Sequence, residues 1–126
     1  MARNYQELEI WRLSYQLALK FYKITNKFPQ HEINNLTSQI RRAGSSVPLN
    51  IAEGCSRRTK NSFLQFLTYA YGSLRELQVL LEFSKDLNYI SSDEYKELLE
   101  DLDKTSRKMF NFMKFVDKEN FFRWFK

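Results

Sequence analysis

Apolar residues recur every three or four positions through four long stretches of this chain, and this period constrains the fold more than any other feature. An α-helix turns once every 3.6 residues, so such spacing places apolar side chains on one helical face. The chain of 126 residues holds only 3 Gly and 2 Pro with which to build turns. Because a sheet protein needs a turn every few residues, we predict an all-α protein with few connections.

The four stretches predict helices over residues 7–27, 31–54 and 60–87 and from Ser91 or Ser92 to about Val116. Helices of this length joined by short connections favour an antiparallel, up-down-up-down four-helix bundle. A chain of this size forms one domain, so residues 1–126 are assigned to one bundle with its core at about 7–116. An aromatic and basic tail, 117–126, follows that core.

The second helix contains Pro48, and its apolar period passes through this proline without a change of phase. A proline inside a helix removes one hydrogen bond and clashes with the carbonyl four residues earlier, here that of Gly44. We therefore predict a kinked helix, with a break at Ser45–Ser46 as the alternative. We expect Asn50 to satisfy a freed carbonyl and Gly54 to cap the helix end.

The third helix has an apolar arc that covers well over half of its circumference, whereas a surface helix needs only one stripe. A surface for self-association explains why the apolar arc is wider than one stripe. After this helix, Asn88 is expected to adopt the left-handed conformation that ends helices. In the fourth helix, early acids and later bases suit the helix dipole without any further function.

The composition excludes several classes of function. One Cys and one His in 126 residues cannot form an internal disulfide or a Cys/His zinc site. Cys55 and His31 would lie roughly 35 Å apart along the second helix, too far for a catalytic pair. The glycines are too dispersed for a phosphate-binding loop. We therefore predict a protein that is not an enzyme and has no metal or cofactor.

No apolar run is long enough for a membrane span, and the N-terminus has no apolar signal core. The expected location is the cytoplasm, without a membrane partner.

The positive charge is concentrated in the first half of the chain. The net charge is +5, and residues 1–63 contain ten bases and four acids. A cluster with a single nearby acid, Glu53, comprises Arg41, Arg42, Arg57, Arg58 and Lys60. Such a cluster attracts phosphate backbones, although an ordinary solvated helix face has the same composition.

The central segment, residues 39–54, together with motifs along most of the chain, resembles a known family. The matching parts are Leu8, Trp11, Phe28-Pro29, Glu32, Gln39-Ile40-Arg41-Arg42-Ala43, Val47-Pro48, Asn50-Ile51-Ala52-Glu53-Gly54, Arg57, Phe66-Leu67, Ala70, Gly72-Ser73-Leu74, Glu76-Leu77, Leu87 and Tyr89-Ile90. They resemble the four-helix-bundle proteins encoded in intervening sequences of bacterial 23S rRNA genes, which are similar to the accessory variability proteins of diversity-generating retroelements. Ser14 and Asn88 depart from this pattern, where the family usually has Ala and Gly.

The resemblance implies a helical bundle that assembles as a ring, typically a homopentamer, without known catalytic activity. For the retroelement relatives it implies binding to nucleic acid and to a reverse transcriptase. In the central segment, Pro48, Asn50, Glu53 and Gly54 are structural candidates, whose expected roles are kink, cap and ion pair.

Two functions follow for this chain. The first is an oligomeric accessory protein that binds the RNA or DNA backbone through Arg41, Arg42, Arg57, Arg58 and Lys60. The alternative is a homo-oligomeric protein–protein scaffold, in which these Arg side chains make structural or intersubunit ion pairs.

Overall fold

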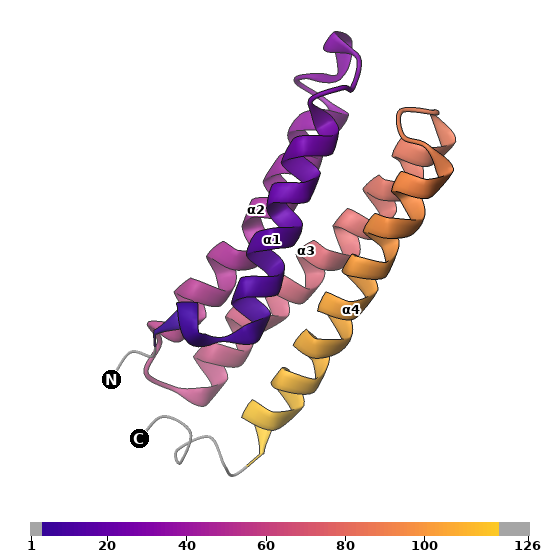
Figure 1. Cartoon of the computed structure of the whole chain (residues 1–126). Helices are drawn as coiled ribbons and strands as arrows, with labels where there is room; N and C mark the ends of the chain where they lie inside the picture. The colour runs from indigo at the N-terminus through magenta and orange to yellow at the C-terminus, as the bar shows by residue number, and fades with distance from the viewer. Residues whose placement is uncertain (1–3, 119–126) are drawn as a thin grey trace.

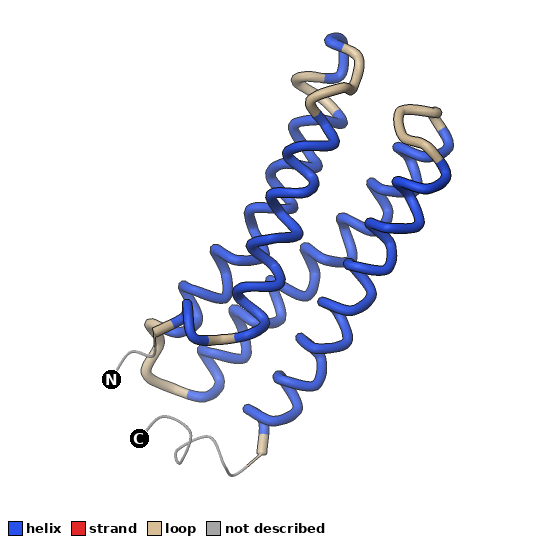
Figure 2. The backbone as a smooth tube through the Cα atoms, viewed as in Figure 1, coloured by secondary structure: helices blue, strands red, loops and turns tan. Residues whose placement is uncertain are grey.

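The computed structural model describes residues 4–118, and over that range it contains helices and no strand (Figure 2). The four long helices are α1 (Glu9–Thr25), α2 (Leu36–Cys55), α3 (Lys60–Asp86) and α4 (Ser92–Asp117). Two short 3-10 helices, η1 (Tyr5–Glu7) and η2 (Gln30–Glu32), precede α1 and α2. The predicted all-α, four-helix architecture is therefore confirmed, while the predicted tail lies outside the described residues from position 119 onward.

The connections between consecutive helices lie at alternating ends of the molecule (Figure 1). Helices α1 and α4, far apart in sequence, are joined by ion pairs, one of which links Lys20 to Asp101. A second pair joins Lys108 Nζ to Glu9 Oε1 at 3.1 Å. Within residues 4–118, no helix has the length and apolarity that crossing a bilayer requires.

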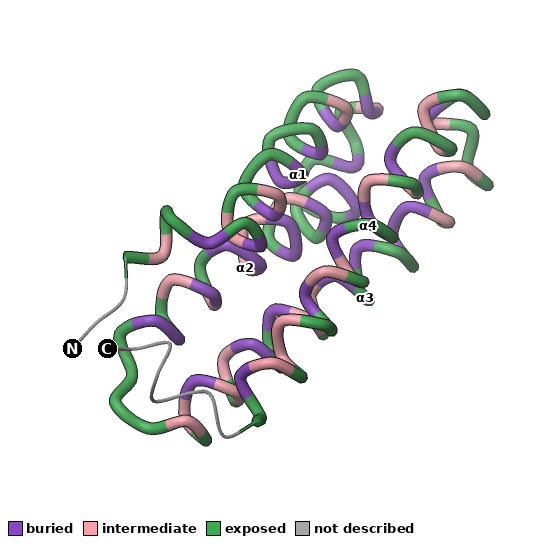
Figure 3. The backbone as a smooth tube through the Cα atoms, turned by 60° about the horizontal axis from the view of Figure 1, so that its bottom comes forward, coloured by how far each residue is buried: buried purple, intermediate pink, exposed green. Residues whose placement is uncertain are grey.

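Buried positions lie on the sides of the helices that face one another (Figure 3). Apolar side chains at these positions form one continuous core to which all four helices contribute. The largest of its fully buried members are Phe21, Phe63, Ile40, Ile51, Leu67, Leu74, Leu77, Leu81, Met109, Val47 and Val116. A residue buried this completely typically stabilises the fold by about 1.5–3 kcal/mol through removal of its apolar surface from water.

The predicted start of the second helix at His31 or Glu32 is wrong. This segment forms η2, α2 begins only at Leu36, and Ile33, which fits the apolar period, is 41% exposed. The carboxylate of Glu32 is buried and accepts hydrogen bonds from Leu36 N (3.3 Å), Asn35 Nδ2 (3.1 Å) and Tyr89 Oη (2.7 Å). Glu32 thereby satisfies the backbone N–H of Leu36 in the first turn of α2. In a helix that began at residue 31, this N–H would instead bond to the carbonyl four residues earlier.

The predicted capping role of Gly54 is also wrong. The helix continues through Gly54 to Cys55, Ser56 occupies the C-cap position, and no described glycine has a positive φ. A Cβ atom on Gly54 would lie 3.0 Å from Phe63 Cδ1 and 3.1 Å from Phe66 Cβ. Gly54 is therefore required by the close approach of α2 to α3.

Helix α2 runs without interruption through Pro48, so the alternative break at Ser45–Ser46 does not occur. Asn50 does bond to a carbonyl, but to that of Ser46 and not to the Gly44 carbonyl that Pro48 frees. Asn50 Nδ2 lies 2.9 Å from both Ser46 O and Ser46 Oγ. Ser73 Oγ of α3 donates to Ser46 Oγ at 2.9 Å, so these polar groups join α2 to α3.

The connection between α3 and α4 follows the sequence prediction closely. Asn88 has a φ of 62°, in the left-handed region, as predicted. Of the two candidate caps, Ser91 is the N-cap of α4: its Oγ accepts from Glu94 N at 3.1 Å. The Glu94 carboxylate in turn accepts from Ser91 N at 2.8 Å, which completes a capping box.

Candidate nucleic-acid interface

The five basic residues of the predicted site fall into two groups. Arg41 and Arg42 lie in the first half of α2, whereas Arg57, Arg58 and Lys60 lie in and just after the α2–α3 connection. At 1.5 Å per residue, Arg41 is roughly 20 Å from the end of α2, so the structure does not bring all five together.

Arg41 is committed to contacts inside the chain. Its Nε donates to Thr25 Oγ1 and its Nη2 to Asn26 Oδ1, both at 3.0 Å, and its guanidinium lies 5.1 Å from the centre of the Tyr22 ring. Thr25 itself is buried at the end of α1. Arg41 therefore fixes α2 to the end of α1, and a phosphate would have to displace these partners.

Arg57 and Glu53 form the expected ion pair, with Arg57 Nη2 3.1 Å from Glu53 Oε2. The same guanidinium lies 4.5 Å from the centre of the Phe66 ring. Both side chains remain well exposed, so the pair itself contributes little to stability.

Arg42 and Arg58 are exposed, and neither guanidinium has a polar or aromatic partner among residues 4–118. Lys60 Nζ donates to Asp117 O at 3.1 Å, which places the α2–α3 connection beside the end of α4 (Figure 1). Bases of both segments therefore meet at this end of the bundle. We refer to them as the basic end: Arg57, Arg58, Lys60, Lys114 and Lys118.

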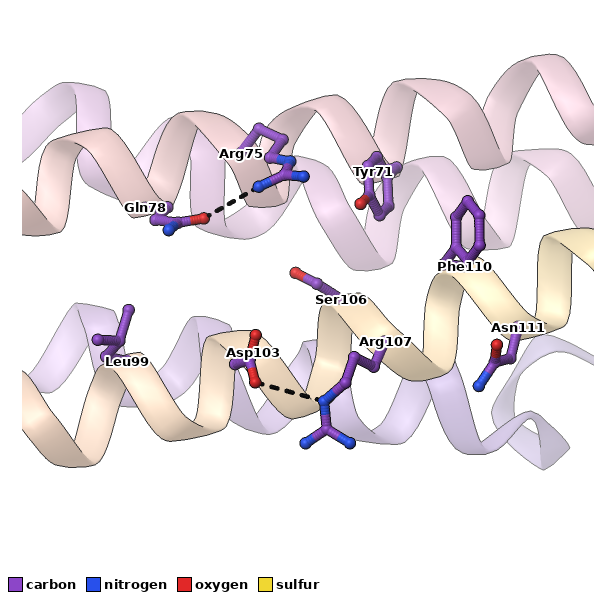
Figure 4. A pocket seen from close by; sticks show the side chains of 9 residues that line it. All are labelled: Tyr71, Arg75, Gln78, Leu99, Asp103, Ser106, Arg107, Phe110 and Asn111. Atoms are coloured by element: carbon purple, nitrogen blue, oxygen red, sulfur yellow. Dashed lines mark hydrogen bonds and ion pairs between the residues drawn. The ribbon is translucent and has the colours of Figure 1, made fainter.

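A groove with a volume of about 420 Å³ runs between α3 and α4, and sequence analysis did not predict it. Tyr71 and Arg75 come from α3, and Phe110 comes from α4 and points toward α3 (Figure 4). The centres of the Tyr71 and Phe110 rings are 6.3 Å apart, and the Arg75 guanidinium lies 5.5 Å from the centre of the Tyr71 ring. The complete lining is Tyr71, Arg75, Gln78, Leu99, Asp103, Ser106, Arg107, Phe110 and Asn111.

One sequence signal for this groove was available. Arg107, Phe110, Asn111, Lys114 and Lys118 recur every three or four positions, which places them on one face of a helix. The helix dipole accounts for Arg107 and Lys114 in this series, but it does not account for the face that they share with Phe110. The residues of α3 that complete the groove depend on how α3 and α4 pack, which helical periodicity does not specify.

Two carboxyl groups with lowered pKa values lie toward the opposite end of the bundle. The hydrogen bond from Tyr89 lowers the pKa of Glu32, although burial opposes it. The hydrogen bond from Tyr95 lowers the pKa of Glu82 in the same way. Each carboxylate accepts a hydrogen bond from a tyrosine of another segment of the chain, so both groups serve to hold the fold together. Among residues 4–118, no cluster of three or more His, Cys, Asp or Glu is placed to hold a metal ion.

Comparison with known proteins gives one family and one fold. The model of a family described as 23S rRNA-intervening sequence protein matches residues 6–111. Among solved structures, the chain is similar to a protein of unknown function from the S23 ribosomal protein family of Bacteroides thetaiotaomicron. The two share 21% sequence identity and a TM-score of 0.75, over 83% of this chain and 98% of that chain. At this identity the likeness supports the fold alone. No curated protein matches the chain.

Proposed function

The chain belongs to the 23S rRNA-intervening sequence protein family, and from that premise we propose that it is a non-enzymatic, oligomeric accessory protein that binds the backbone of RNA or DNA. The observation that carries this proposal is the basic end, where bases of two segments converge. There Glu53 is already paired with Arg57, while Arg58 has no partner among the described residues. Phosphate contacts of this kind release counterions, so the affinity falls steeply with salt.

Self-association is supported by an exposed apolar strip along α3, which we define as Tyr69, Val79, Phe83 and Leu87. These side chains are 48–56% exposed and lie on the side of α3 that faces away from the core. Val79, Phe83 and the C-cap residue Leu87 follow at four-residue spacing, whereas Tyr69 lies ten residues before Val79. A second copy of the chain would remove them from water. Assembly would also present several basic ends together, and multivalency would then strengthen weak individual contacts.

A second candidate function is a protein–protein scaffold, and the contacts of Arg41 favour it. This residue, expected to bind phosphate, is instead bonded within the chain to Thr25 and Asn26. If Arg42 and Arg58 similarly bond to a neighbouring subunit, the basic residues hold the assembly together and leave no site for nucleic acid.

The two functions are distinguished by a salt titration of RNA binding together with the oligomer mass of the same variants. RNA binding is measured by filter retention at increasing salt for the wild type and for Arg58→Glu, with Lys96→Glu as a matched control on the first turns of α4. The accessory protein binds with a steep salt dependence that Arg58→Glu weakens and Lys96→Glu does not. A scaffold instead shows loss of oligomer mass by light scattering for Arg58→Glu, with no salt-dependent binding in the wild type.

A further inference from the structure

We propose that the α3–α4 groove binds an unpaired nucleotide of a single strand, whose backbone continues along α4 to the basic end. This inference rests on the proposed function and extends the binding surface from the basic end into the groove. It concerns residues outside the predicted Arg/Lys cluster: Tyr71, Arg75 and Phe110 in the groove, with Lys114 and Lys118 beyond it.

The aromatic rings of the groove are available for stacking. Phe110 is 51% exposed although it is a large apolar side chain, and Tyr71 is half-buried beside it. Every nucleobase has a π-face that stacks on such rings, whereas the faces of a base inside a duplex are already covered by its neighbours. The exposed ring of Phe110 therefore favours an unpaired base.

The cationic groups around these rings suit a phosphate. The Arg75 guanidinium has only a 3.4 Å contact to Gln78 Oε1 and the ring of Tyr71 as partners within the described residues. On the other side, Lys114 Nζ lies 5.5 Å from the centre of the Phe110 ring. A base stacked in the groove would thus have a cation on each side, where its flanking phosphates lie.

The path from the groove to the basic end carries little negative charge. Lys118 lies one turn beyond Lys114, and Asp117, next to it, has its carbonyl bonded to Lys60. Between Asp103 and Lys118, α4 contains no other acid than Asp117, and Asp103 is paired with Arg107 at 3.3 Å. Across the groove, α3 has only Glu76 between Lys60 and Leu81. A backbone running along α4 therefore meets cations with few competing carboxylates.

The volume of the groove, about 420 Å³, is within the range of about 300–1,000 Å³ that is typical of small-ligand sites. Ser106 points into the groove from α4, and Gln78 and Asn111 add amide groups at its sides (Figure 4). Stacking on aromatic rings accepts every base, so binding should show little sequence preference.

The test uses the full chain and a fluorescently labelled ten-nucleotide oligouridine, with its duplex with oligoadenosine as the comparison, followed by anisotropy at several salt concentrations. We expect tighter binding of the single strand. Phe110→Leu keeps the apolar volume but loses the π-face, and it should weaken single-strand binding by about fivefold or more. Phe110→Tyr keeps the ring and should bind as the wild type does. Arg75→Gln should reduce the salt slope by about 0.7, the value of one phosphate contact.

Tyr15→Leu is the matched control, because Tyr15 is an exposed aromatic on α1, away from the groove. Two outcomes overturn the groove as a binding site and leave salt-dependent binding at the basic end intact. One is equal weakening of single-strand binding by Tyr15→Leu, and the other is unchanged binding by Phe110→Leu. Loss of oligomer mass in Phe110→Leu, measured by light scattering, also overturns it, because the groove is then an interface between copies. If the wild type binds neither strand form, the proposed function fails as well.

Discussion

At the scale of single residues, two glycines in helices have opposite surroundings. A Cβ on Gly54 would come within 3.0 Å of the buried Phe63 ring, whereas a Cβ on Gly72 would meet nothing within 4 Å. Gly54→Ala gains about 1 kcal/mol of helix propensity but overpacks the contact between α2 and α3, which typically costs about 1–3 kcal/mol. We expect a net loss of about 1 kcal/mol in the free energy of unfolding, measured by urea denaturation.

The matched control is Gly72→Ala, which should stabilise the protein by about 0.5–1 kcal/mol because the propensity gain is unopposed. If both substitutions stabilise the protein to the same extent, the close packing around Gly54 does not exclude a Cβ atom.

Glu32 makes the stability of the protein depend on pH. The hydrogen bond from Tyr89 is the largest cause of its lowered pKa, so the folded state favours the ionised carboxylate. The resulting stabilisation is complete above the ordinary pKa of 4.5 and is lost as the pH falls through the lowered pKa of the folded state. Tyr89→Phe should therefore lower the thermal midpoint at pH 7, and this difference should shrink toward zero as the pH falls below 4.5. An equal difference at pH 3 and pH 7 would contradict this assignment.

At the scale of helices, α2 is where sequence and structure differ most. Local patterns predicted α3 to within one residue and identified Ser91 as a candidate cap for α4, because periodicity and capping residues are local. The start of α2 depends instead on Glu32 and on Tyr89, 57 positions further along the chain. Likewise, the role of Gly54 depends on Phe63 and Phe66 in the next helix. A contact between distant segments leaves no periodic trace in either one.

Arg41 is expected to stabilise the pairing of α1 and α2. Arg41→Ala removes two hydrogen bonds to Thr25 and Asn26 and the contact with the Tyr22 ring, and should cost about 1–2 kcal/mol of unfolding free energy. Arg42→Ala, next to it and without such partners among the described residues, should remain within about 0.5 kcal/mol of the wild type. If the two variants lose equal stability in thermal unfolding, the contacts of Arg41 are not what holds these helices together.

At the scale of the whole molecule, the concentration of positive charge was evident from the sequence, but its arrangement was not. The predicted cluster is divided by the length of α2, while Lys114 and Lys118, from the second half of the chain, join the basic end through the contact of Lys60 with α4. Counting charges by halves of the chain cannot detect this, because an antiparallel bundle brings the last helix back beside the middle of the sequence. The α3–α4 groove could not be predicted for the same reason, because it forms only when the two helices pack together.

The exposed strip on α3 gives a prediction for assembly. The sequence assigned the excess apolar arc of this helix to self-association, and Phe83, within that arc, is 55% exposed in the single chain. Phe83→Glu places a charge where a second copy would bury the ring, and an unpaired buried charge strongly disfavours association. We expect light scattering to show a shift of the mass toward that of one chain, 15.2 kDa, with an unchanged thermal midpoint at high dilution.

Leu49→Glu provides the control, since Leu49 is 66% exposed on α2 and receives the same change of chemistry. It should retain the oligomer mass of the wild type. Dissociation by Leu49→Glu but not by Phe83→Glu would move the interface to the α1–α2 side of the bundle. In that case the surface shared between copies would be the apolar groove on that side, which is lined by Trp11, Tyr15 and Leu19 among others. The strip on α3 would then be available to a different partner.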